Sequence, residues 1–446
     1  MLTLPAGITP YYQEAGIVIY HGDCHEVLPQ LAPGSVDTLI TDPPYHLVSQ
    51  DKRDHRRASP SIKQRTKIGG FMNQAWDGGS IAFDPATWAA ALRVAKPGAM
   101  LLAFGGTRTW HRLACALEDA GWELRDTLMW VYGSGFPKSH DISKAIDKAD
   151  GVERTEVIGR SLYEGRRPNA WGGKHGGDNA YGFNAQPEMP IFAPATEAAK
   201  EWDGWGSALK PAYEPILLAM KPLDGTFAQN ALKWGVAGLN IDGARIETDQ
   251  HPGLHKSFSN QGHPGYQRPW RDGSTMPEYK PTPHGRWPAN IILDEAAAAL
   301  LDHQAGDHPG MSGGRATDNR KSGHEAIPSF NRKPSAPFMR GDSGPVSRFF
   351  YVAKADRLER QGDLGEANTH PTVKPLALMK YLCLLTETPT GGLILDPFAG
   401  SGTTLVAAKA LRRPCIGIEQ DEASCQTIVN RLRQEVLALG EEPSHA

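Results

Sequence analysis

Short apolar runs rich in β-branched residues alternate with helix-like stretches at both ends of this 446-residue chain. Strands are predicted at 17–21, 36–40, 100–104, 127–131, 393–395 and 415–419. Helices are predicted at 86–94, 107–120, 376–386, 402–411 and 421–437. Strands and helices that alternate in this way build βαβ units around a parallel sheet. The pattern therefore predicts a doubly wound α/β fold assembled from both ends of the chain.

The middle of the chain, at 138–345, has a different character. Its Gly/Pro-rich stretches show little helical or strand periodicity, and the whole chain contains 48 Gly and 35 Pro. That content predicts long irregular segments. Ordered islands are expected inside the region at 214–221, 238–246 and 289–293. A chain of this length is enough for two or three domains.

The composition excludes several classes of protein. The 47 Lys and Arg against 50 Asp and Glu give a net charge of −3, which rules out a histone-like polycation but not a local basic patch. With 40% hydrophobic and 22% charged residues, the chain is not a disordered protein. We expect no membrane span and no secretory signal, because the sequence has neither a run of ~18 apolar residues nor a basic segment followed by an apolar one at its start.

The cysteines and histidines predict neither a disulfide framework nor a metal site. The five cysteines are odd in number and lack C-x-x-C spacing, which fits a reducing cytoplasm. Two pairs have H-x-x-x-H spacing, His21/His25 and His251/His255, but Gly22 and Pro252-Gly253 oppose a helix at each.

The strongest functional signal is Asp42-Pro43-Pro44-Tyr45, directly after the predicted strand at 36–40 and Thr41. Two consecutive prolines fix the backbone and bar a helix, so they leave an acidic and an aromatic side chain on a rigid loop. Open α/β sheets bind their ligands at this end of their strands. Taken alone, the segment is also compatible with an ordinary Pro-Pro turn.

Such a loop suits methylation of an exocyclic amine. The amine of adenine or cytosine is a poor nucleophile, because its lone pair is delocalised into the ring. The Asp42 carboxylate and the Pro43 carbonyl could accept its two N–H bonds and hold the nitrogen in line with a methyl donor. Tyr45 would stack on a base swung out of the helix.

A second signal, Asp396-Pro397-Phe398-Ala399-Gly400-Ser401-Gly402, lies between a predicted strand and a helix. Gly400 and Gly402 permit a tight turn and close approach of the backbone to a ligand, although ordinary βα turns share this pattern. Glu419 ends the next strand, where an acid suits the ribose hydroxyls of a nucleoside cofactor. Position 405 is Leu rather than Gly, which favours a cofactor without a pyrophosphate.

Together these motifs resemble those of the S-adenosylmethionine-dependent DNA amino-methyltransferases, in the permuted β-type group of bacteria and phages. In that group the D-P-P-Y block precedes the cofactor block, as Asp42 precedes Asp396 here. Further blocks match in the family's order: YHGDC (20–24), KPG to FGG (96–106), TLMWVYGSGFP (127–137), AYEPILLAMKP (212–222) and HPTVKP (370–375). The likeness covers about half of the chain.

The resemblance implies a mainly parallel, seven-stranded methyltransferase sheet of circularly permuted, Rossmann-like order. It implies S-adenosylmethionine as cofactor with no metal, double-stranded DNA as partner, and a role in restriction-modification. The implied target-amine residues are Asp42, Pro43, Pro44 and Tyr45. The implied cofactor residues are Asp396, Phe398, Gly400, Gly402 and Glu419, with Asp23, Thr372 and Lys374 as further candidates.

The implied parts are a catalytic half at 1–137, an insert at 138–204, the last strand at 205–222, a target-recognition region at 223–345 and a cofactor-binding half at 346–446. The family's last two strands usually form a close pair, whereas about seventy residues separate them here. Neither insert carries a family pattern. The resemblance does not predict the oligomeric state or the recognised sequence.

A basic stretch follows the target-amine loop. At 50–67 it holds seven Lys or Arg against two Asp, a local balance of +5. It is either a solvated loop or a set of phosphate contacts beside the extruded base. Its basic residues are Lys52, Arg53, Arg56, Arg57, Lys63, Arg65 and Lys67.

The predicted activity is methylation of adenine N6 in DNA, with cytosine N4 as the alternative. The choice rests on the resemblance, in which Asp at the first motif position accompanies adenine and Ser accompanies cytosine N4. Methylation of cytosine C5 is disfavoured, because the one Pro-Cys pair, Pro414-Cys415, opens a predicted buried strand. An RNA or protein-amide methyltransferase and a DNA-binding relative without turnover remain as rivals.

Overall fold

The computed structural model describes residues 7–45, 80–133, 139–162, 188–246, 285–307, 312–313, 338–339, 344–354 and 373–433. The chain divides into two compact units. One combines Met1–Gly133 with Tyr213–Ala446, and the other is Ser134–Ala212. The first unit therefore draws on both ends of the chain.

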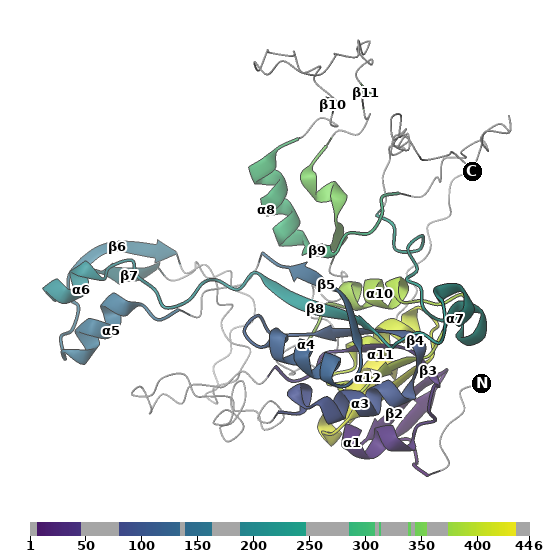
Figure 1. The fold of residues 1–446 in the computed structure, drawn as a ribbon. Helices are drawn as coiled ribbons and strands as arrows, with labels where there is room; N and C mark the ends of the chain where they lie inside the picture. The colour runs from purple at the N-terminus through teal and green to yellow at the C-terminus, as the bar shows by residue number, and fades with distance from the viewer. Residues whose placement is uncertain are drawn as a thin grey trace, which may run out of the picture. The chain divides into compact units, whose positions relative to one another are not determined.

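The first unit is built on a sheet that contains ten strands within the described residues (Figure 1). In order across the sheet they are β1 (Tyr12–Glu14), β2 (Ile17–His21), β14 (Cys415–Glu419), β13 (Ile394–Asp396), β3 (Val36–Thr41), β4 (Ala95–Phe104), β8 (Tyr213–Met220), β5 (Glu123–Val131), β9 (Ile291–Asp294) and β12 (Tyr351–Ala353). Only β1 and β8 run antiparallel to their neighbours. The mainly parallel α/β sheet predicted from the sequence is confirmed.

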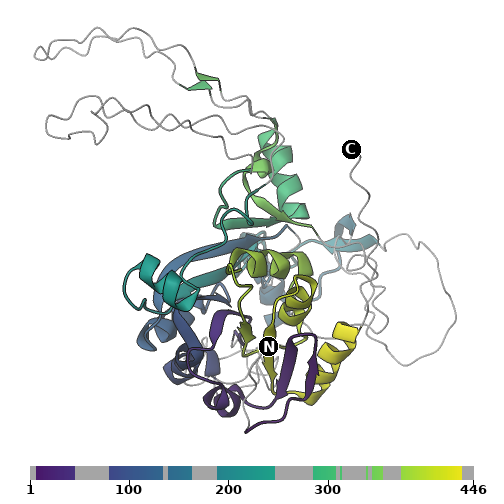
Figure 2. The same ribbon diagram turned by 90° about the vertical axis from the view of Figure 1, so that its right-hand side faces the viewer.

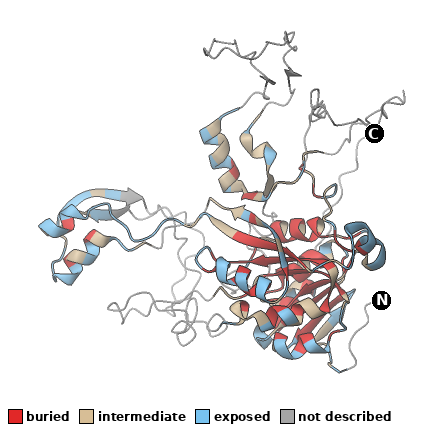
Figure 3. Cartoon of the chain, in the orientation of Figure 1, coloured by how far each residue is buried: buried red, intermediate tan, exposed pale blue. Residues whose placement is uncertain are grey.

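Helices cover both faces of this sheet (Figures 1 and 2). On one face lie α1 (Cys24–Val27), α3 (Pro85–Val94) and α4 (Trp110–Asp119). On the other face lie α10 (Leu376–Leu385), α11 (Thr403–Ala410) and α12 (Glu422–Arg433). Successive strand residues point to opposite faces of the sheet. Ile17 and Ile19 of β2 therefore pack on the face covered by α10, α11 and α12, while Val18 and Tyr20 pack on the face covered by α1, α3 and α4. Figure 3 shows the resulting burial, which is concentrated in the central strands and the helix faces that cover them.

The sheet differs from the expected one in two ways. The strand predicted at 100–104 is longer in the structure, where β4 begins at Ala95 and includes Pro97. A register irregularity between β3 and β4 and a positive φ of +79° at Gly98 allow the strand to include the proline. The seven expected strands correspond to β2, β14, β13, β3, β4, β8 and β5, and the sheet continues beyond them at both edges.

The separated strands β5 and β8 pair antiparallel across the long insert, with Trp130 opposite Glu214. Beyond β5, β9 pairs parallel with β5, and β12 pairs parallel with β9. Further helices and helical turns described in this unit are η1 (Leu28–Gln30), η4 (Ile81–Phe83), α7 (Phe227–Trp234), α8 (Glu295–Ala305) and η5 (Val346–Phe349). A two-stranded pair is formed by β10 (Ser312–Gly313) and β11 (Phe338–Met339). The region at 223–345 thus contributes a strand, β9, to the main sheet.

The second unit has its own small framework. Its elements are α5 (Ile142–Ala149), β6 (Val157–Leu162), β7 (Glu188–Phe192) and α6 (Glu197–Glu201). The antiparallel pair β6–β7 lies beside two helices that are joined through Asp147. The Asp147 carboxylate accepts hydrogen bonds from the backbone N–H groups of Ala195 and Thr196 and from Arg154 Nε. Burial by itself would raise the pKa of Asp147, but these bonds lower it to about 2.

Candidate active site

Four strand ends that the sequence singled out lie at one edge of the sheet. The strands β2, β14, β13 and β3 are parallel neighbours in that order. At or directly after their carboxyl ends stand, in the same order, Asp23, Glu419, Asp396 and Asp42. Gly22 N donates to Glu419 O at 2.9 Å, and Thr41 Oγ1 donates to Asp396 Oδ1 at 2.7 Å. Segments from opposite ends of the sequence therefore meet where open α/β sheets bind ligands.

The segment between β13 and α11 is a tight loop whose shape depends on glycine. Gly400 and Gly402 have φ angles of +54° and +78°, in the left-handed region that other residues rarely adopt. A Cβ on Gly402 would also lie 2.6 Å from the side chain of Ile428 in α12. Ala399 N donates to Ile418 O at 2.9 Å and holds the loop against the end of β14. The sequence pattern and the loop geometry therefore agree.

Glu419 joins this loop to the end of β14. Its Oε2 accepts from Gly400 N at 2.7 Å, and its Oε1 accepts from Asp421 N at 2.8 Å. Burial raises the pKa of Glu419, and the two backbone N–H groups oppose that rise. Each carboxylate oxygen keeps a second lone pair. Glu419 can therefore accept hydroxyl groups of a ligand while it stays anchored to the loop.

Asp396 is buried at the start of the same loop. Its Oδ1 accepts from Thr41 Oγ1 at 2.7 Å and from Phe398 N at 3.2 Å. Burial raises the pKa of Asp396 to about 6, although the hydroxyl groups of Thr404 and Thr41 lower it. This carboxyl group thus connects the loop to the end of β3, next to Asp42.

The remaining residues of the predicted cofactor set differ in their surroundings. Asp23 caps the N-terminus of α1 and accepts from His25 N at 2.8 Å. The ring of Phe398 lies 6.3 Å from that of Trp88, centroid to centroid. Thr372 lies outside the described residues. The structure therefore gathers most of the predicted set around one loop: Asp23, Asp396, Phe398, Gly400, Gly402 and Glu419.

Lys374 belongs to the cofactor set predicted from the sequence, and its ammonium lies against Asp42 and Glu214. Its Nζ is 2.6 Å from Asp42 Oδ2 and 3.2 Å from Glu214 Oε2, and its side chain is only 7% exposed. Burial lowers the pKa of Lys374, but the carboxylates of Asp42 and Glu214 outweigh that effect and leave the pKa raised. A charged lysine therefore bridges the target-amine loop and β8.

Tyr45 is held through both its side chain and its backbone. Its hydroxyl donates to Glu214 Oε2 at 2.9 Å, and its backbone carbonyl accepts from Thr109 Oγ1 at 3.1 Å. Burial raises the pKa of Tyr45 well above its usual value, and the Asp42 carboxylate raises it further. A Cβ on Gly106 would lie 3.3 Å from the Tyr45 ring, so a glycine lets the ring pack closely there.

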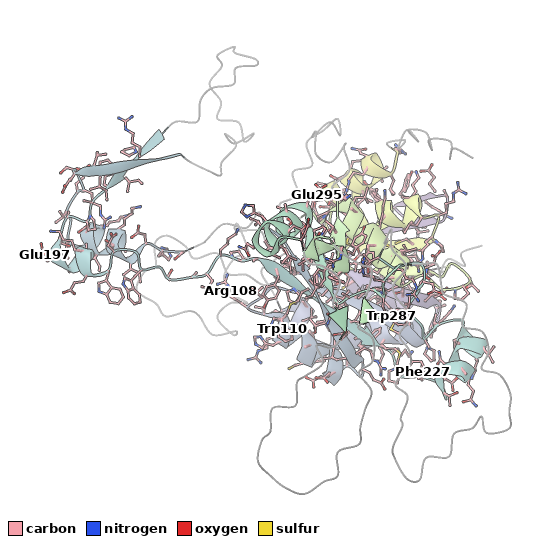
Figure 4. All side chains as sticks on the ribbon, turned by 90° about the horizontal axis from the view of Figure 1, so that it is seen from above. Arg108, Trp110, Glu197, Phe227, Trp287 and Glu295 are labelled. Carbon is pink, nitrogen blue, oxygen red and sulfur yellow. The ribbon has the colours of Figure 1, made fainter. Side chains whose placement is uncertain are left out.

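A narrow, largely apolar recess adjoins this loop, with an empty volume of about 160 Å³ that includes open solvent. It is lined by Pro43, Pro44, Tyr45, Ala82, Phe83, Phe104, Gly105, Gly106, Thr109, Trp110 and Leu113. Trp110 begins α4, and the exposed side chain of Arg108 stands two residues before it (Figure 4). The lining of the recess thus includes four aromatic side chains, those of Tyr45, Phe83, Phe104 and Trp110.

Asp42 Oδ1 is a buried carboxylate oxygen with no hydrogen-bond partner. Across the described ranges, the other buried side-chain atoms without a partner are Tyr20 OH, Trp130 Nε1 and Tyr381 OH, none of which belongs to a carboxylate. An unpaired buried acceptor costs about 1–3 kcal/mol. Because Lys374 occupies Oδ2, Oδ1 is the oxygen of Asp42 that remains open to an external donor.

Two contributors to this site, Thr41 and Glu214, were not predicted as site residues. Thr41 ends β3 immediately before Asp42, and Glu214 is the second residue of β8. Glu214 could have been noticed in the block AYEPILLAMKP as an acidic residue near the start of an otherwise apolar strand. Burial raises the pKa of Tyr132, and Glu214 adds to that rise, so Tyr132 faces the same charges.

Further findings concern the cysteines, possible metal ligands, possible membrane spans and the basic stretch. Cys415 is fully buried at the start of β14, as expected for a strand residue, and all five cysteines are free thiols. Where the structure describes the chain, no group of three or more His, Cys, Asp or Glu side chains is placed to hold a metal ion. Likewise, none of the described helices has the length and apolar character needed to cross a bilayer. The basic stretch at 50–67 lies outside the described residues.

Comparison with known proteins identifies one family and several short matches. A family model of DNA methylases, N6_N4_Mtase, matches residues 36–430. The Type II methyltransferase M.HindIII of Haemophilus influenzae is 52% identical over 63 residues, which cover 14% of this chain and 20% of that protein. The Type II methyltransferase M2.DpnII of Streptococcus pneumoniae is 45% identical over 69 residues, which cover 16% of this chain and 25% of that protein. The chain thus spans only a quarter or less of these curated relatives.

The similarity to solved structures is more distant. The cytosine-N4-specific PvuII DNA methyltransferase has a TM-score of 0.44 at 11% identity, with 97% of this chain and 91% of that chain covered. The complex of M1.HpyAVI with SAM has a TM-score of 0.36 at 16% identity, with 94% of this chain and 99% of that chain covered. Scores this low do not assign a substrate to this chain.

Proposed function

Because the chain belongs to the DNA methylase family N6_N4_Mtase, we propose that it transfers a methyl group from S-adenosylmethionine to an exocyclic amino group of a base in double-stranded DNA. The observation that carries this proposal is the buried, unpartnered Oδ1 of Asp42 at the carboxyl end of β3. Two further carboxyl groups stand beside it: Asp396 at the end of β13 and Glu419 at the end of β14. The site is thus suited to bring an amine and a methyl donor together.

Asp42 and Pro43 supply the chemistry on the target side. Asp42 Oδ1 accepts one N–H of the target amine, and the Pro43 carbonyl accepts the other. These bonds draw the nitrogen towards sp³ geometry and hold its lone pair in line with the donor, which lowers the barrier to transfer. Pro44 keeps the loop rigid, and Tyr45 stacks on a base swung out of the duplex.

The residues on the cofactor side fit S-adenosylmethionine. A cationic cofactor with ribose hydroxyls suits Glu419, whose oxygens keep lone pairs for those hydroxyls, and the nearby carboxyl group of Asp396. Gly400 and Gly402 let the backbone approach the cofactor closely. Asp23 and Phe398 border this loop. When bound, the cofactor supplies the activated methyl group.

The finer assignment is adenine N6. Asp at position 42 supports it through the resemblance to D-P-P-Y enzymes that act on adenine, and a purine offers Tyr45 more stacking area than a pyrimidine. Cytosine N4 presents the same kind of amino group and is the alternative. We place the reaction in the cytoplasm, as part of DNA modification of the restriction-modification type.

The deciding experiment is methylation in vitro by the full chain. Double-stranded DNA is incubated with the protein and S-adenosylmethionine, digested to nucleosides and analysed by mass spectrometry. N6-methyladenine is the expected product, and N4-methylcytosine without it would overturn the adenine assignment alone. Methylation of RNA or protein but not DNA, or DNA binding without any transfer, would overturn the DNA methyltransferase assignment.

A further inference from the structure

A single buried ammonium connects the two ends of the Asp42-Pro43-Pro44-Tyr45 loop. Lys374 Nζ lies 2.6 Å from Asp42 Oδ2 and 3.2 Å from Glu214 Oε2. The same Oε2 of Glu214 accepts the hydroxyl of Tyr45 at 2.9 Å. These contacts form a closed chain, Asp42–Lys374–Glu214–Tyr45, in which the first and last members belong to one loop.

The surroundings of this ammonium keep it charged and in place. Its Nζ stands 5.2 Å from the centroid of the Tyr45 ring and 5.0 Å from that of the Phe104 ring, within reach of both aromatic systems. Two carboxylates face one cation, and a lone buried ammonium would be unstable without them. The pKa of Lys374 accordingly stays raised although burial alone would lower it.

The arrangement also decides which oxygen of Asp42 is available. A carboxylate can turn about its terminal torsion, which is a soft one. The Lys374 contact fixes Oδ2 at one side, and this leaves Oδ1 buried and unpartnered on the other. A reactive geometry must be held within about 0.5 Å to be effective, and an unanchored Asp42 side chain would not meet that requirement.

We propose that Lys374, anchored by Glu214, is a positioning residue that orients the Asp42 carboxylate towards the target amine. The inference rests on the proposed function, and it gives Lys374 a role in the rate of methyl transfer rather than in binding the cofactor. Glu214 is the partner that holds the lysine and, through the Tyr45 hydroxyl, the far end of the loop.

The test uses the full chain, duplex DNA and single-turnover methyl transfer. Lys374→Met should reduce the rate constant by on the order of 10²-fold, while the affinity for S-adenosylhomocysteine stays within about three-fold of wild type. Lys374→Arg should restore part of the rate, because it keeps the cation. In an Asp42→Asn background, Lys374→Met should add little further loss, since both changes remove one shared interaction. Lys148→Met, at an exposed lysine of α5, is the matched control.

Each outcome bears on one proposal. A Lys374→Met protein with a wild-type rate, or one whose defect is weaker cofactor binding with an unchanged rate, would overturn the positioning role. If Lys374→Met does not fold, Glu214→Gln decides: loss of the carboxylate that anchors the ammonium should lower the rate of methyl transfer, and a wild-type rate in this variant counts against the positioning role. A wild-type protein that does not methylate DNA, or an Asp42→Ala protein that does, contradicts the proposed function itself.

Discussion

The two sides of the site hold their carboxylates in different ways. On the cofactor side, Glu419 accepts backbone N–H groups of the adjacent loop, from Gly400 and Asp421, at 2.7 and 2.8 Å. On the target side, Asp42 depends on the side chain of Lys374, 332 residues further along the chain, and one of its oxygens has no partner.

This difference indicates what each side needs in order to work. Backbone donors are fixed once the strand and loop have formed, so the cofactor side is complete as soon as the sheet folds. A lysine side chain must be brought in by tertiary packing, and the buried Oδ1 of Asp42 has no donor among the described residues. Changes on the cofactor side should therefore act on folding and binding, and changes on the target side should act on rate.

The largest expected effect comes from removing the chain after residue 390. The deletion takes away β13 and β14, which lie between β2 and β3 in the sheet, together with the glycine loop and Glu419. We expect loss of cofactor binding and of cooperative folding, measured by circular dichroism and by titration with S-adenosylhomocysteine. A soluble fragment of residues 1–390 that still binds the cofactor would contradict the two-ended assembly of the site.

Asp42→Ala should abolish methyl transfer and leave cofactor binding nearly intact. Its open oxygen is on the target side, and the loss of hydrogen bonds made in the transition state costs ~10²-fold or more in rate. The rate is measured under single-turnover conditions, and the affinity for S-adenosylhomocysteine should stay within a few-fold. Asp119→Ala, at an exposed position of α4, serves as control. A near-normal rate in Asp42→Ala would remove the distinction between the two sides.

Glu419→Ala should give the reverse pattern. It removes the anchor of the Gly400 N–H and the acceptor for ribose hydroxyls, and hydrogen bonds to charged groups contribute about 1.5–3 kcal/mol each. We expect cofactor affinity to fall roughly 10- to 100-fold in calorimetric titration, with most of the methyl-transfer rate recovered at saturating cofactor. Glu422→Gln, at an exposed position in the first turn of α12, should match wild type. Unchanged affinity in Glu419→Ala would remove Glu419 from the cofactor site.

Neutralising the basic residues at 52–67 should weaken DNA binding by roughly 10-fold at low salt and flatten its dependence on salt concentration. Phosphate contacts carry affinity without sequence information, so all DNA sequences should be affected alike. Binding is measured at several salt concentrations on target and non-target duplexes. A changed sequence preference with an unchanged salt slope would mean that this stretch reads bases.

Much of the glycine loop and its flanking strands could be predicted from the sequence, because their determinants are local. The strands at 17–21 and 415–419 begin and end as predicted, since each is a continuous apolar run. The glycines of the loop and the acid at 419 follow one another within a short segment. Positive φ angles at Gly400 and Gly402 account for those residue types directly.

The target side was only half predictable, because its partners are distant in the chain. The position of Asp42 after a strand could be identified, but the contact with Lys374 depends on how the segment before α10 packs against β3 and β8. The extension of the sheet by β9 and β12 was missed for a similar reason: these strands have only four and three residues, and each joins the sheet by pairing with a neighbour, β9 with β5 and β12 with β9.

The smallest expected effect is a pH dependence on the cofactor side that comes from Asp396. Its folded pKa of about 6 lies above the ordinary value of 3.8 because the group is buried. Between about pH 4 and pH 6, Asp396 therefore keeps its proton in the native state but has lost it in the unfolded state. The contribution of this group to the free energy of unfolding falls as pH rises through that window and is constant above it. Asp396→Asn should remove that slope, as measured by urea unfolding at several pH values.

The same ionisation should strengthen binding of the cationic cofactor. Between pH 5 and pH 7 Asp396 gains its negative charge, and a carboxylate close to a sulfonium attracts it, although water and neighbouring groups screen the effect. We expect the affinity for S-adenosylmethionine to rise a few-fold over this range, and the affinity for S-adenosylhomocysteine, which lacks the sulfonium charge, to rise less. Asp396→Asn should make the two ligands respond alike to pH. If both ligands show the same pH dependence in the wild-type protein, the cofactor does not sense the charge of Asp396, and the role of this carboxyl group is confined to holding the loop against Thr41.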